Sequence, residues 1–373
     1  MISPKIDPTA TRVSVEFKHT RPLIGCRFDP SGRFLFVSSE DNSLQRYDLL
    51  TGQKTAFVGH QSWVRGIAFL PTKPPIVVPA ASSAVAATVG GSALHPRTAS
   101  PFTLISTDYH GNIFWWDGAA ESSTPYRTLP AHAGWIRAVA VSADGKRLAT
   151  CGNDNLVKLW TASDGVAVRT LRGHESHVYN VAFHPKEPRL VSADLKGHVI
   201  DWDLAKGEPV RTLDGKVFHK YDNGFWADIG GVRGMGFDAT GSTLACVGIT
   251  NVSNAFAGIG NPLVVLFNWK DGKPKQLKPK DTFQGTGWGV HIHPSGFVVA
   301  AGGAGQGRIW FWNLADDVNT FTATVPSNAR DMAVHPDGTA VAVAGSNGTA
   351  YLYTLTPAPT ATKPAVPMTP KKK

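Results

Sequence analysis

The chain has 373 residues, of which 42% are hydrophobic and 17% charged, with 38 Gly and 26 Pro. This length and apolar content allow a large core and argue against a disordered chain, and the Gly and Pro content suits many tight turns. We expect neither a signal peptide nor a membrane span, because no apolar run reaches 18 residues, and the net charge of +9 allows an acidic partner without requiring one.

The first hundred residues contain one isolated strand and one unusual insertion. Residues 1–12 are expected to form an N-terminal extension. Residues 13–17 (VSVEF) alternate as a strand does, but no strand precedes them to complete a sheet. Residues 71–101 are rich in Ala, Ser and Pro, and we interpret them as a low-complexity insertion.

A clear repeat occupies the middle of the chain. Residues 131–173 contain four strand-like runs, WIRAVAVS, KRLATCG, LVKLW and AVRTL, separated by the turn clusters ADGK, GNDN and ASDG. The next segment repeats this plan, since His132 to His174 and Trp160 to Trp202 are both 42 residues apart. A period near 40 residues with four strands per unit is typical of a β-propeller.

The repeats resemble the WD40 family in Gly173-His174, in the turn residue Asp154, in Trp160 and in the pair Trp202-Asp203. The resemblance implies that each complete unit holds one hydrogen-bonded set of side chains. In the third unit this set maps onto His132, Thr150, Asp154 and Trp160.

We expect this set to be complete only in the third unit. The fourth unit has the His, Ser and Trp but carries Lys196 in the position of the Asp. The first unit has Thr20-Arg21 where Gly-His is expected, and the fifth to seventh units lack the His.

Seven strand aromatics equivalent to Trp160 predict a seven-bladed propeller over residues 13–356. They are Tyr47, Trp116, Trp160, Trp202, Phe267, Trp312 and Tyr353. Their two long gaps are explained by the 71–101 insertion in blade 2 and by insertions at 216–229 and 250–262 in blade 5. The resemblance implies that strand 13–17 closes the last blade, which removes open sheet edges. The Pro- and Lys-rich residues 357–373 are expected to be disordered.

No motif indicates catalysis, a metal or a cofactor. The sequence GGAGQG at 302–307 precedes a strand, so it offers no helix N-terminus to a phosphate. His291 and His293 resemble a metal pair, but His293-Pro294 recurs as His184-Pro185 and His335-Pro336, which indicates a turn residue. A GxSxG nucleophile motif is absent from the sequence.

The sparse and odd number of cysteines indicates buried thiols rather than disulfides. They are Cys26, Cys151 and Cys246, each within a predicted strand. This usage favours a reducing compartment, and we expect a cytoplasmic protein.

The family resemblance also implies where a partner binds, namely the mouth of the central channel. Residues three and five positions after the Gly-His histidine face this mouth in WD40 propellers. Aligning the inner strands by their apolar pattern places Ile24, Arg65, Arg137, Tyr179, Arg233, Trp288 and Arg330 at the second of these positions. The first position is occupied by Pro22, Trp63, Trp135, His177, Gly231, Thr286 and Asn328.

Arginine and aromatic side chains dominate these two rings. Arginine pairs with carboxylates and phosphates and stacks on aromatic faces, and Trp, Tyr and Arg carry much of the energy of protein interfaces. We therefore predict a partner site formed by Trp63, Arg65, Trp135, Arg137, His177, Tyr179, Arg233, Trp288 and Arg330. The alternative is that the arginines pair with acids such as Asp331 or Asp228 while the tryptophans cap the core. Likewise, the aromatic residues of 216–229 either bind a partner or fold back as a plug.

The leading hypothesis is a non-catalytic, monomeric scaffold that binds an acidic or phosphorylated peptide at this mouth. One alternative is a propeller enzyme with an active site in the same mouth, against which the missing acid/base pair counts. A second alternative is a nucleic-acid-binding propeller, because tryptophans beside arginines can stack on bases.

Overall fold

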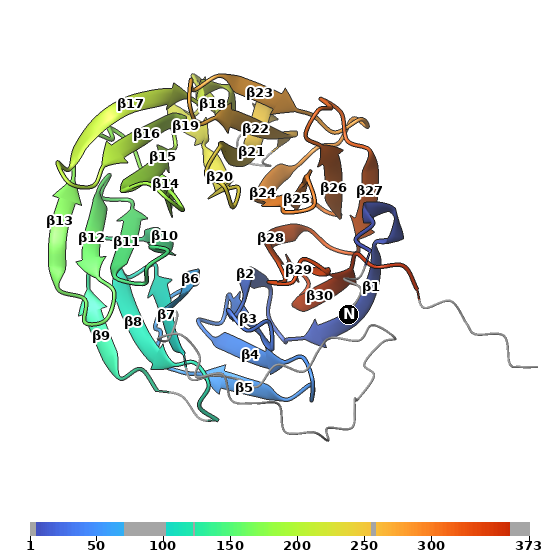
Figure 1. Cartoon of the computed structure of the whole chain (residues 1–373), viewed down its shortest axis with the longest axis horizontal. Coiled ribbons are helices and arrows are strands. Elements are labelled where there is room, and N and C mark those ends of the chain that lie inside the picture. The colour runs from blue at the N-terminus through green and yellow to red at the C-terminus, as the bar shows by residue number, and fades with distance from the viewer. Residues whose placement is uncertain (1–4, 71–101, 122–123, 255–258, 359–373) are drawn as a thin grey trace, which may run out of the picture.

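The computed structural model describes residues 5–70, 102–121, 124–254 and 259–358. Seven antiparallel four-stranded sheets are arranged in a ring around a central opening, as Figure 1 shows. The predicted all-β, seven-bladed propeller is therefore confirmed. The 71–101 insertion and residues 359–373 of the predicted tail lie outside the described residues.

Each blade places its first strand at the channel and its fourth at the rim. Blade 1 consists of β2 (Leu23–Phe28), β3 (Phe34–Ser39), β4 (Leu44–Asp48) and β5 (Lys54–Phe57), and blade 2 of β6 (Val64–Leu70), β7 (Thr103–Asp108), β8 (Asn112–Asp117) and β9 (Arg127–Pro130). Blade 3 consists of β10 (Ile136–Val141), β11 (Arg147–Gly152), β12 (Val157–Thr161) and β13 (Ala167–Leu171). Blade 4 consists of β14 (Val178–Phe183), β15 (Arg189–Asp194), β16 (His198–Asp203) and β17 (Glu208–Asp214).

Blade 5 consists of β20 (Val232–Phe237), β21 (Thr243–Asn254), β22 (Ile259–Asn268) and β23 (Pro274–Leu277). Blade 6 consists of β24 (Thr286–His293), β25 (Phe297–Gly303), β26 (Gly307–Asn313) and β27 (Phe321–Val325). Blade 7 consists of β28 (Ala329–Val334), β29 (Ala340–Gly345), β30 (Thr349–Thr354) and β1 (Arg12–Lys18), which pairs antiparallel with β30. A short 3-10 turn, η1 (Pro8–Ala10), precedes β1.

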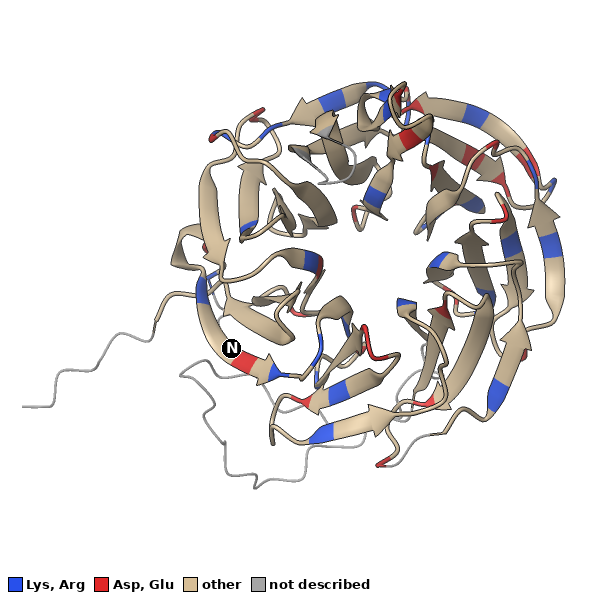
Figure 2. Cartoon of the chain, turned by 180° about the vertical axis from the view of Figure 1, so that it is seen from behind, with Lys and Arg blue, Asp and Glu red and all other residues tan. Residues whose placement is uncertain are grey.

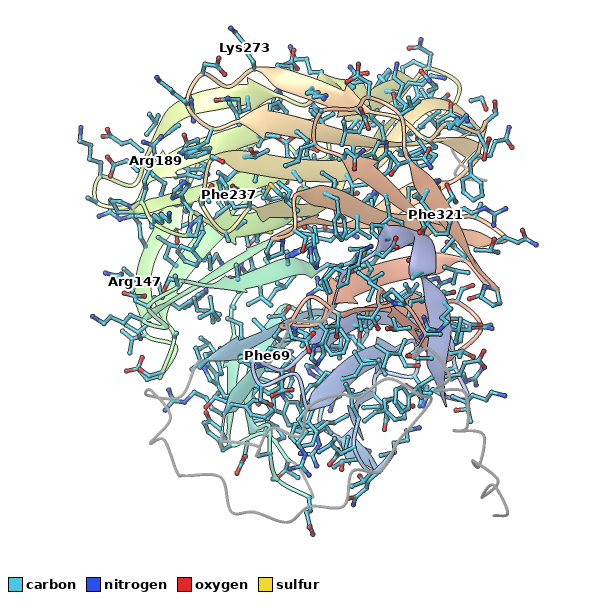
Figure 3. The ribbon with its side chains drawn as sticks, turned by 45° about the vertical axis from the view of Figure 1, so that its right-hand side comes forward. Phe69, Arg147, Arg189, Phe237, Lys273 and Phe321 are labelled. Carbon is cyan, nitrogen blue, oxygen red and sulfur yellow. The ribbon has the colours of Figure 1, made fainter. Side chains whose placement is uncertain are left out.

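The hydrophobic core lies between neighbouring sheets. Because side chains alternate between the two faces of a strand, each blade packs against both neighbours. Between blades 1 and 2, for example, the buried rings of Phe36 and Phe57 pack with Phe102 and Trp116. In the oblique view of Figure 3, side chains fill the space between successive sheets.

The three cysteines lie in these cores. All three thiols are free and buried, and burial raises their pKa. The prediction of buried thiols is therefore confirmed, and such thiols are inert rather than reactive.

Histidines in the turn after the first strand connect blades across their seams. The Nε2–H of His184 in blade 4 donates to the carbonyl oxygen of Gly241 in blade 5 over 3.0 Å. The equivalent bonds join His293 to Gly338 over 2.9 Å and His335 to Gly32 over 2.8 Å. These residues are the recurring turn histidines of the sequence, and each links two blades.

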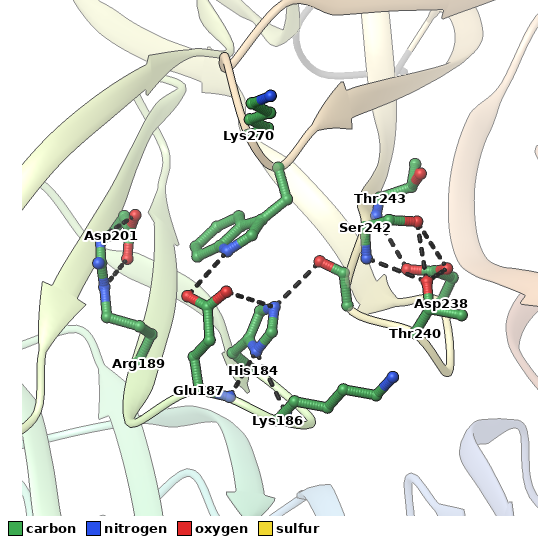
Figure 4. A network of polar contacts seen from close by, with 12 residues as sticks. His184, Lys186, Glu187, Arg189, Asp201, Asp238, Thr240, Ser242, Thr243 and Lys270 are labelled. Carbon is green, nitrogen blue, oxygen red and sulfur yellow. Dashed lines mark hydrogen bonds and ion pairs between the residues drawn. The ribbon is translucent and has the colours of Figure 1, made fainter.

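The seam between blades 4 and 5 has the further polar contacts drawn in Figure 4. Trp269 donates from its indole Nε1 to a carboxylate oxygen of Glu187 over 3.2 Å. Beside it, within blade 4, Arg189 forms a two-point ion pair with the fully buried Asp201. The seam is thus held by both packing and hydrogen bonds.

The side-chain set predicted for blade 3 is present. The Nδ1–H of His132 donates to Asp154 over 2.8 Å, while Nε2 lies 2.8 Å from the hydroxyl of Thr150, which also accepts from the Trp160 indole over 2.9 Å. Burial lowers the pKa of His132 despite the neighbouring carboxylate, which favours the neutral ring, and the unprotonated Nε2 of that ring accepts a hydrogen bond from the Thr150 hydroxyl.

The prediction that only blade 3 has a complete set is wrong. Blade 2 has the equivalent contacts among His60, Ser106, Asp108 and Trp116. Blade 4 has them among His174, Ser192, Asp194 and Trp202. In both blades the carboxylate comes two residues after the Ser, at the end of the second strand. The sequence pattern of blade 3 had placed the acid of blade 4 at position 196, which is a lysine, but Asp194 forms the contact with His174 instead.

Blade 1 contains a further variant of this arrangement. His19, one residue before the expected Gly-His position, contacts Asp41 over 2.7 Å through Nε2 and the Lys54 ammonium over 3.0 Å through Nδ1. Blade 1 lacks the Gly-His histidine at Thr20-Arg21, and His19 contacts the turn aspartate Asp41 in its place.

Candidate functional site

A β-bulge occurs at the same place in the inner strand of every blade. The register of each inner strand shifts around one residue: Ile24, Arg65, Arg137, Tyr179, Arg233, Trp288 and Arg330. A bulge leaves one residue out of the ladder and changes the direction of its side chain. The sequence alignment of the seven inner strands is therefore correct, and its second ring consists of the bulged residues.

Several bulged side chains line a central cavity of about 460 Å³. Its charged lining consists of Arg27, Arg65, Arg137, Arg233 and Asp331. Figure 2 shows basic positions on inner strands that border the opening. With four arginines and one aspartate, the cavity has a positive potential that would concentrate anions.

Three of these arginines alternate with aromatic rings around the opening. The Arg65 guanidinium lies 5.5 Å from the centre of the Trp288 ring, and that of Arg233 lies 5.4 Å from the same ring. Arg233 and Arg137 lie 4.5 and 4.7 Å from the Tyr179 ring. These distances are within the range of cation–π contacts, which hold the guanidinium groups without neutralising them.

The three arginines have no acidic partner within the described residues. Arg65 donates to the carbonyl of Ile24 over 2.6 Å, and Arg137 donates to the side-chain oxygen of Asn153 over 2.8 Å. Each guanidinium has five N–H donors, so donors remain for a ligand.

Two buried donors beside the cavity have no hydrogen-bond partner among the described residues: the Nε of Arg233 and the indole Nε1 of Trp288. Burial lowers the pKa of Arg233, and the nearby charges of Arg137 and Arg65 lower it further, against an opposing effect of Tyr179. An anion at this position would relieve both the repulsion and the unsatisfied donors.

Exposed aromatic rings form a platform beside this cluster. Trp63 and Trp135 are 41% and 42% exposed. Tyr109 lies between them, stacked parallel to Trp135 with ring centres 4.2 Å apart. Arg137 contacts both Trp135 and Tyr109, which connects the platform to the arginines.

Tyr109 was not among the predicted residues. It follows Asp108 in the turn between the second and third strands of blade 2, and this turn opens on the same face as the inner-strand starts. An aromatic residue in the turn sequence DYHG could have indicated this position, but the turn lies outside the inner strands from which the predicted site residues were taken.

Two of the predicted site residues, Arg330 and His177, pair with other groups of the protein. Arg330 forms an ion pair with Glu40 of blade 1 and does not line the cavity. His177 donates from Nδ1 to the carbonyl of Asn153 over 2.9 Å.

The alternative expectation was that Asp331 or Asp228 neutralises the arginines of the mouth, but both acids pair with other residues. Asp331 pairs with Arg27 over 2.6 Å, and Asp228 contacts His219 over 2.7 Å. Neither acid neutralises Arg65, Arg137 or Arg233.

The cavity offers no evident acid/base pair among the described residues. His291 lines it, and burial together with the neighbouring His293 lowers the pKa of His291 to about 4. Within the same part of the chain, no group of three or more His, Cys, Asp or Glu is placed to hold a metal ion. Nor does the described part of the chain have a helix with the length and apolar character needed to cross a bilayer.

The fold and the channel mouth define a seven-bladed β-propeller. Three of its segments match the family model "WD domain, G-beta repeat", at residues 11–48, 123–161 and 165–203. Each match begins at the outer strand of one blade and ends at the third strand of the next. The chain is thus a seven-bladed propeller that contains three WD40 repeats.

Curated relatives are similar over part of the chain. The nuclear distribution protein PAC1 of Coccidioides posadasii is 29% identical over 136 residues, which is 36% of this chain and 26% of that protein. PAC1 of Arthroderma benhamiae is 29% identical over 149 residues, 39% of this chain and 28% of that protein. The chain therefore spans little more than a quarter of the length of these relatives.

Proposed function

We propose that this chain is a non-catalytic interaction scaffold that binds an acidic or phosphorylated peptide at the channel mouth. The observation that carries the proposal is the cluster of Arg65, Arg137 and Arg233, which have aromatic neighbours but no acidic partner among the described residues. Guanidinium groups bind carboxylate and phosphate oxygens in a two-point geometry, and the aromatic contacts fix their orientation.

The exposed platform of Trp63 and Trp135 supports a ligand longer than a single anion. A peptide whose acidic group enters the arginine cluster would extend across these rings, where Trp and Tyr contribute much of the binding energy. The WD40 repeats and the similarity to PAC1 proteins support an interaction role, and the arginines of the mouth favour an acidic or phosphorylated partner.

The proposal is tested by screening a library of acidic and phosphorylated peptides against the purified chain by fluorescence polarisation. For the strongest binder, Arg137→Glu should weaken binding at least ~100-fold, because one favourable charge contact becomes a repulsive one. Arg330→Glu is the matched control, since Arg330 occupies the same bulge position but already pairs with Glu40. Equal loss in both variants, or no loss in either, would reject the site.

A second candidate is single-stranded nucleic acid, favoured by the stacked Trp135 and Tyr109 beside Arg137. A fluorescent oligo-dT in the same assay tests it. Binding that survives physiological salt and requires Trp135 would support this function over the peptide.

A further inference from the structure

The segment between blades 4 and 5 forms a hairpin with a firmly anchored base. It consists of the 3-10 turn η2 (Lys216–Phe218), β18 (His219–Asp222) and β19 (Ala227–Gly230). Phe218 is 1% exposed and packs in the core shared by blades 4 and 5, so the segment is not simply a plug of the channel. The ammonium of Lys220 donates to the carbonyl of Val252 on β21 over 2.6 Å.

The tip of this hairpin presents aromatic side chains to solvent. Trp226 is 83% exposed, more than any other large apolar side chain of the described residues, and Tyr221 is 46% exposed. Trp226 also has a φ of 51°, in the left-handed region, which costs an L-residue roughly 1–2 kcal/mol. Such strain persists where the surroundings impose it, and it is concentrated at ligand-binding positions.

Hydrogen bonds fix the backbone of the hairpin on both sides of Trp226. A side-chain oxygen of Asp222 accepts from the backbone N–H of Gly224 over 2.9 Å and fixes the turn. Across the strands, His219 contacts Asp228 over 2.7 Å. The backbone that carries the exposed rings is therefore fixed before any partner binds, which lowers the entropic cost of binding.

The base of the hairpin touches the channel mouth. Gly231, directly after β19, has a φ of 84°, and a Cβ at this position would lie 2.9 Å from the Tyr179 ring. Tyr179 in turn contacts Arg137 and Arg233. The base of the hairpin therefore adjoins the arginine cluster.

We propose that this hairpin is an aromatic anchor for the protein partner that docks on the mouth, with Trp226 and Tyr221 entering an apolar pocket of that partner. The inference rests on the proposed function, and it adds a second contact region. It defines the partner as a folded protein with an apolar pocket next to its acidic segment.

Charge and area argue against other occupants. An anionic membrane attracts clusters of Lys and Arg, but the hairpin's Lys216 and Lys220 are balanced by Asp222 and Asp228. The two exposed rings offer on the order of 300 Å² of contact area. A stable interface, with a second copy or any other protein, needs about 800 Å² per partner, so the two rings alone are too small, and the mouth beside the hairpin base would supply further contact area.

The test places the photo-crosslinking residue p-benzoylphenylalanine at position 226, at position 135 in the mouth, or at position 126 as a control. Tyr126 is 58% exposed and is therefore a matched exposed aromatic away from the hairpin. The full chain is irradiated in an extract of its own cells, and the adducts are identified by mass spectrometry.

Binding of the purified adduct protein is then measured for the wild type, Trp226→Gly and Tyr126→Ala. Glycine adopts a φ of 51° without strain, so Trp226→Gly should stay folded.

The inference predicts that positions 226 and 135 capture the same protein and that position 126 does not. Trp226→Gly should weaken binding of that protein at least ~10-fold, while Tyr126→Ala leaves it unchanged. Capture at 135 alone overturns the inference and leaves the proposed function standing. Capture at 226 alone overturns both. A second copy of the chain captured at 226, or Trp226-dependent sedimentation with phosphatidylserine vesicles, also overturns it.

Discussion

Asp194 is expected to be the most sensitive polar residue of blade 4. It is fully buried, and its carboxylate accepts from His174 Nδ1 over 2.9 Å and from the backbone N–H of His198 over 2.9 Å. Asp194→Ala leaves the buried donor of His174 and the partly buried N–H of His198 without an acceptor, at a cost of about 1–3 kcal/mol for a fully buried donor. Removal of one partner from a buried pair costs about 3–5 kcal/mol, and we expect a loss of unfolding free energy in this range.

Urea denaturation at neutral pH, followed by circular dichroism, measures this loss. Lys196→Ala is the control, because Lys196 stands in the sequence position of the Asp of blade 3 yet forms none of these contacts. It should change the unfolding free energy by less than about 0.5 kcal/mol. If Lys196→Ala destabilises as much as Asp194→Ala, or if Asp194→Ala costs less than about 1 kcal/mol, the assignment of Asp194 to this set is wrong.

Two further substitutions test the histidine contacts. Burial alone would raise the pKa of Asp41, but hydrogen bonds from Ser43 and His19 outweigh it and lower the pKa to about 2. Asp41→Asn should therefore cost about 1–2 kcal/mol above roughly pH 4, and the difference from wild type should vanish as the pH falls towards about 2; a difference that does not change with pH would contradict this. His335→Ala removes the bond to the Gly32 carbonyl and should lower the unfolding free energy by about 2 kcal/mol in urea denaturation, whereas a loss below about 0.5 kcal/mol would show that the seam does not depend on it.

The blade count and the alignment of the inner strands could be predicted because they depend on local patterns. Strand aromatics such as Trp160 and Trp202 recur at a fixed spacing, and each inner strand has the same apolar pattern around its bulge. A bulge is a feature of one strand pair, so the residue that it redirects keeps its place in the repeat. This is why the amino-acid sequence alone was enough to align Arg65, Arg137 and Arg233.

Contacts between distant blades could not be predicted in this way. Glu40 and Arg330 are 290 residues apart, and they meet only because the ring closes between blades 7 and 1. Asp194 was missed for a different reason: a carboxylate two or four residues after the Ser or Thr can reach the same histidine, because the strand end and the turn lie close together. A fixed sequence position was too strict a criterion.

Hydrogen–deuterium exchange of the chain with and without its strongest acidic or phosphorylated peptide tests the central claim most directly. We predict that protection is concentrated in residues 63–66, 135–138 and 231–234, where the arginines and the aromatic platform lie. Protection confined to the outer strands of the blades, with these three segments unchanged, would contradict a binding site at the channel mouth.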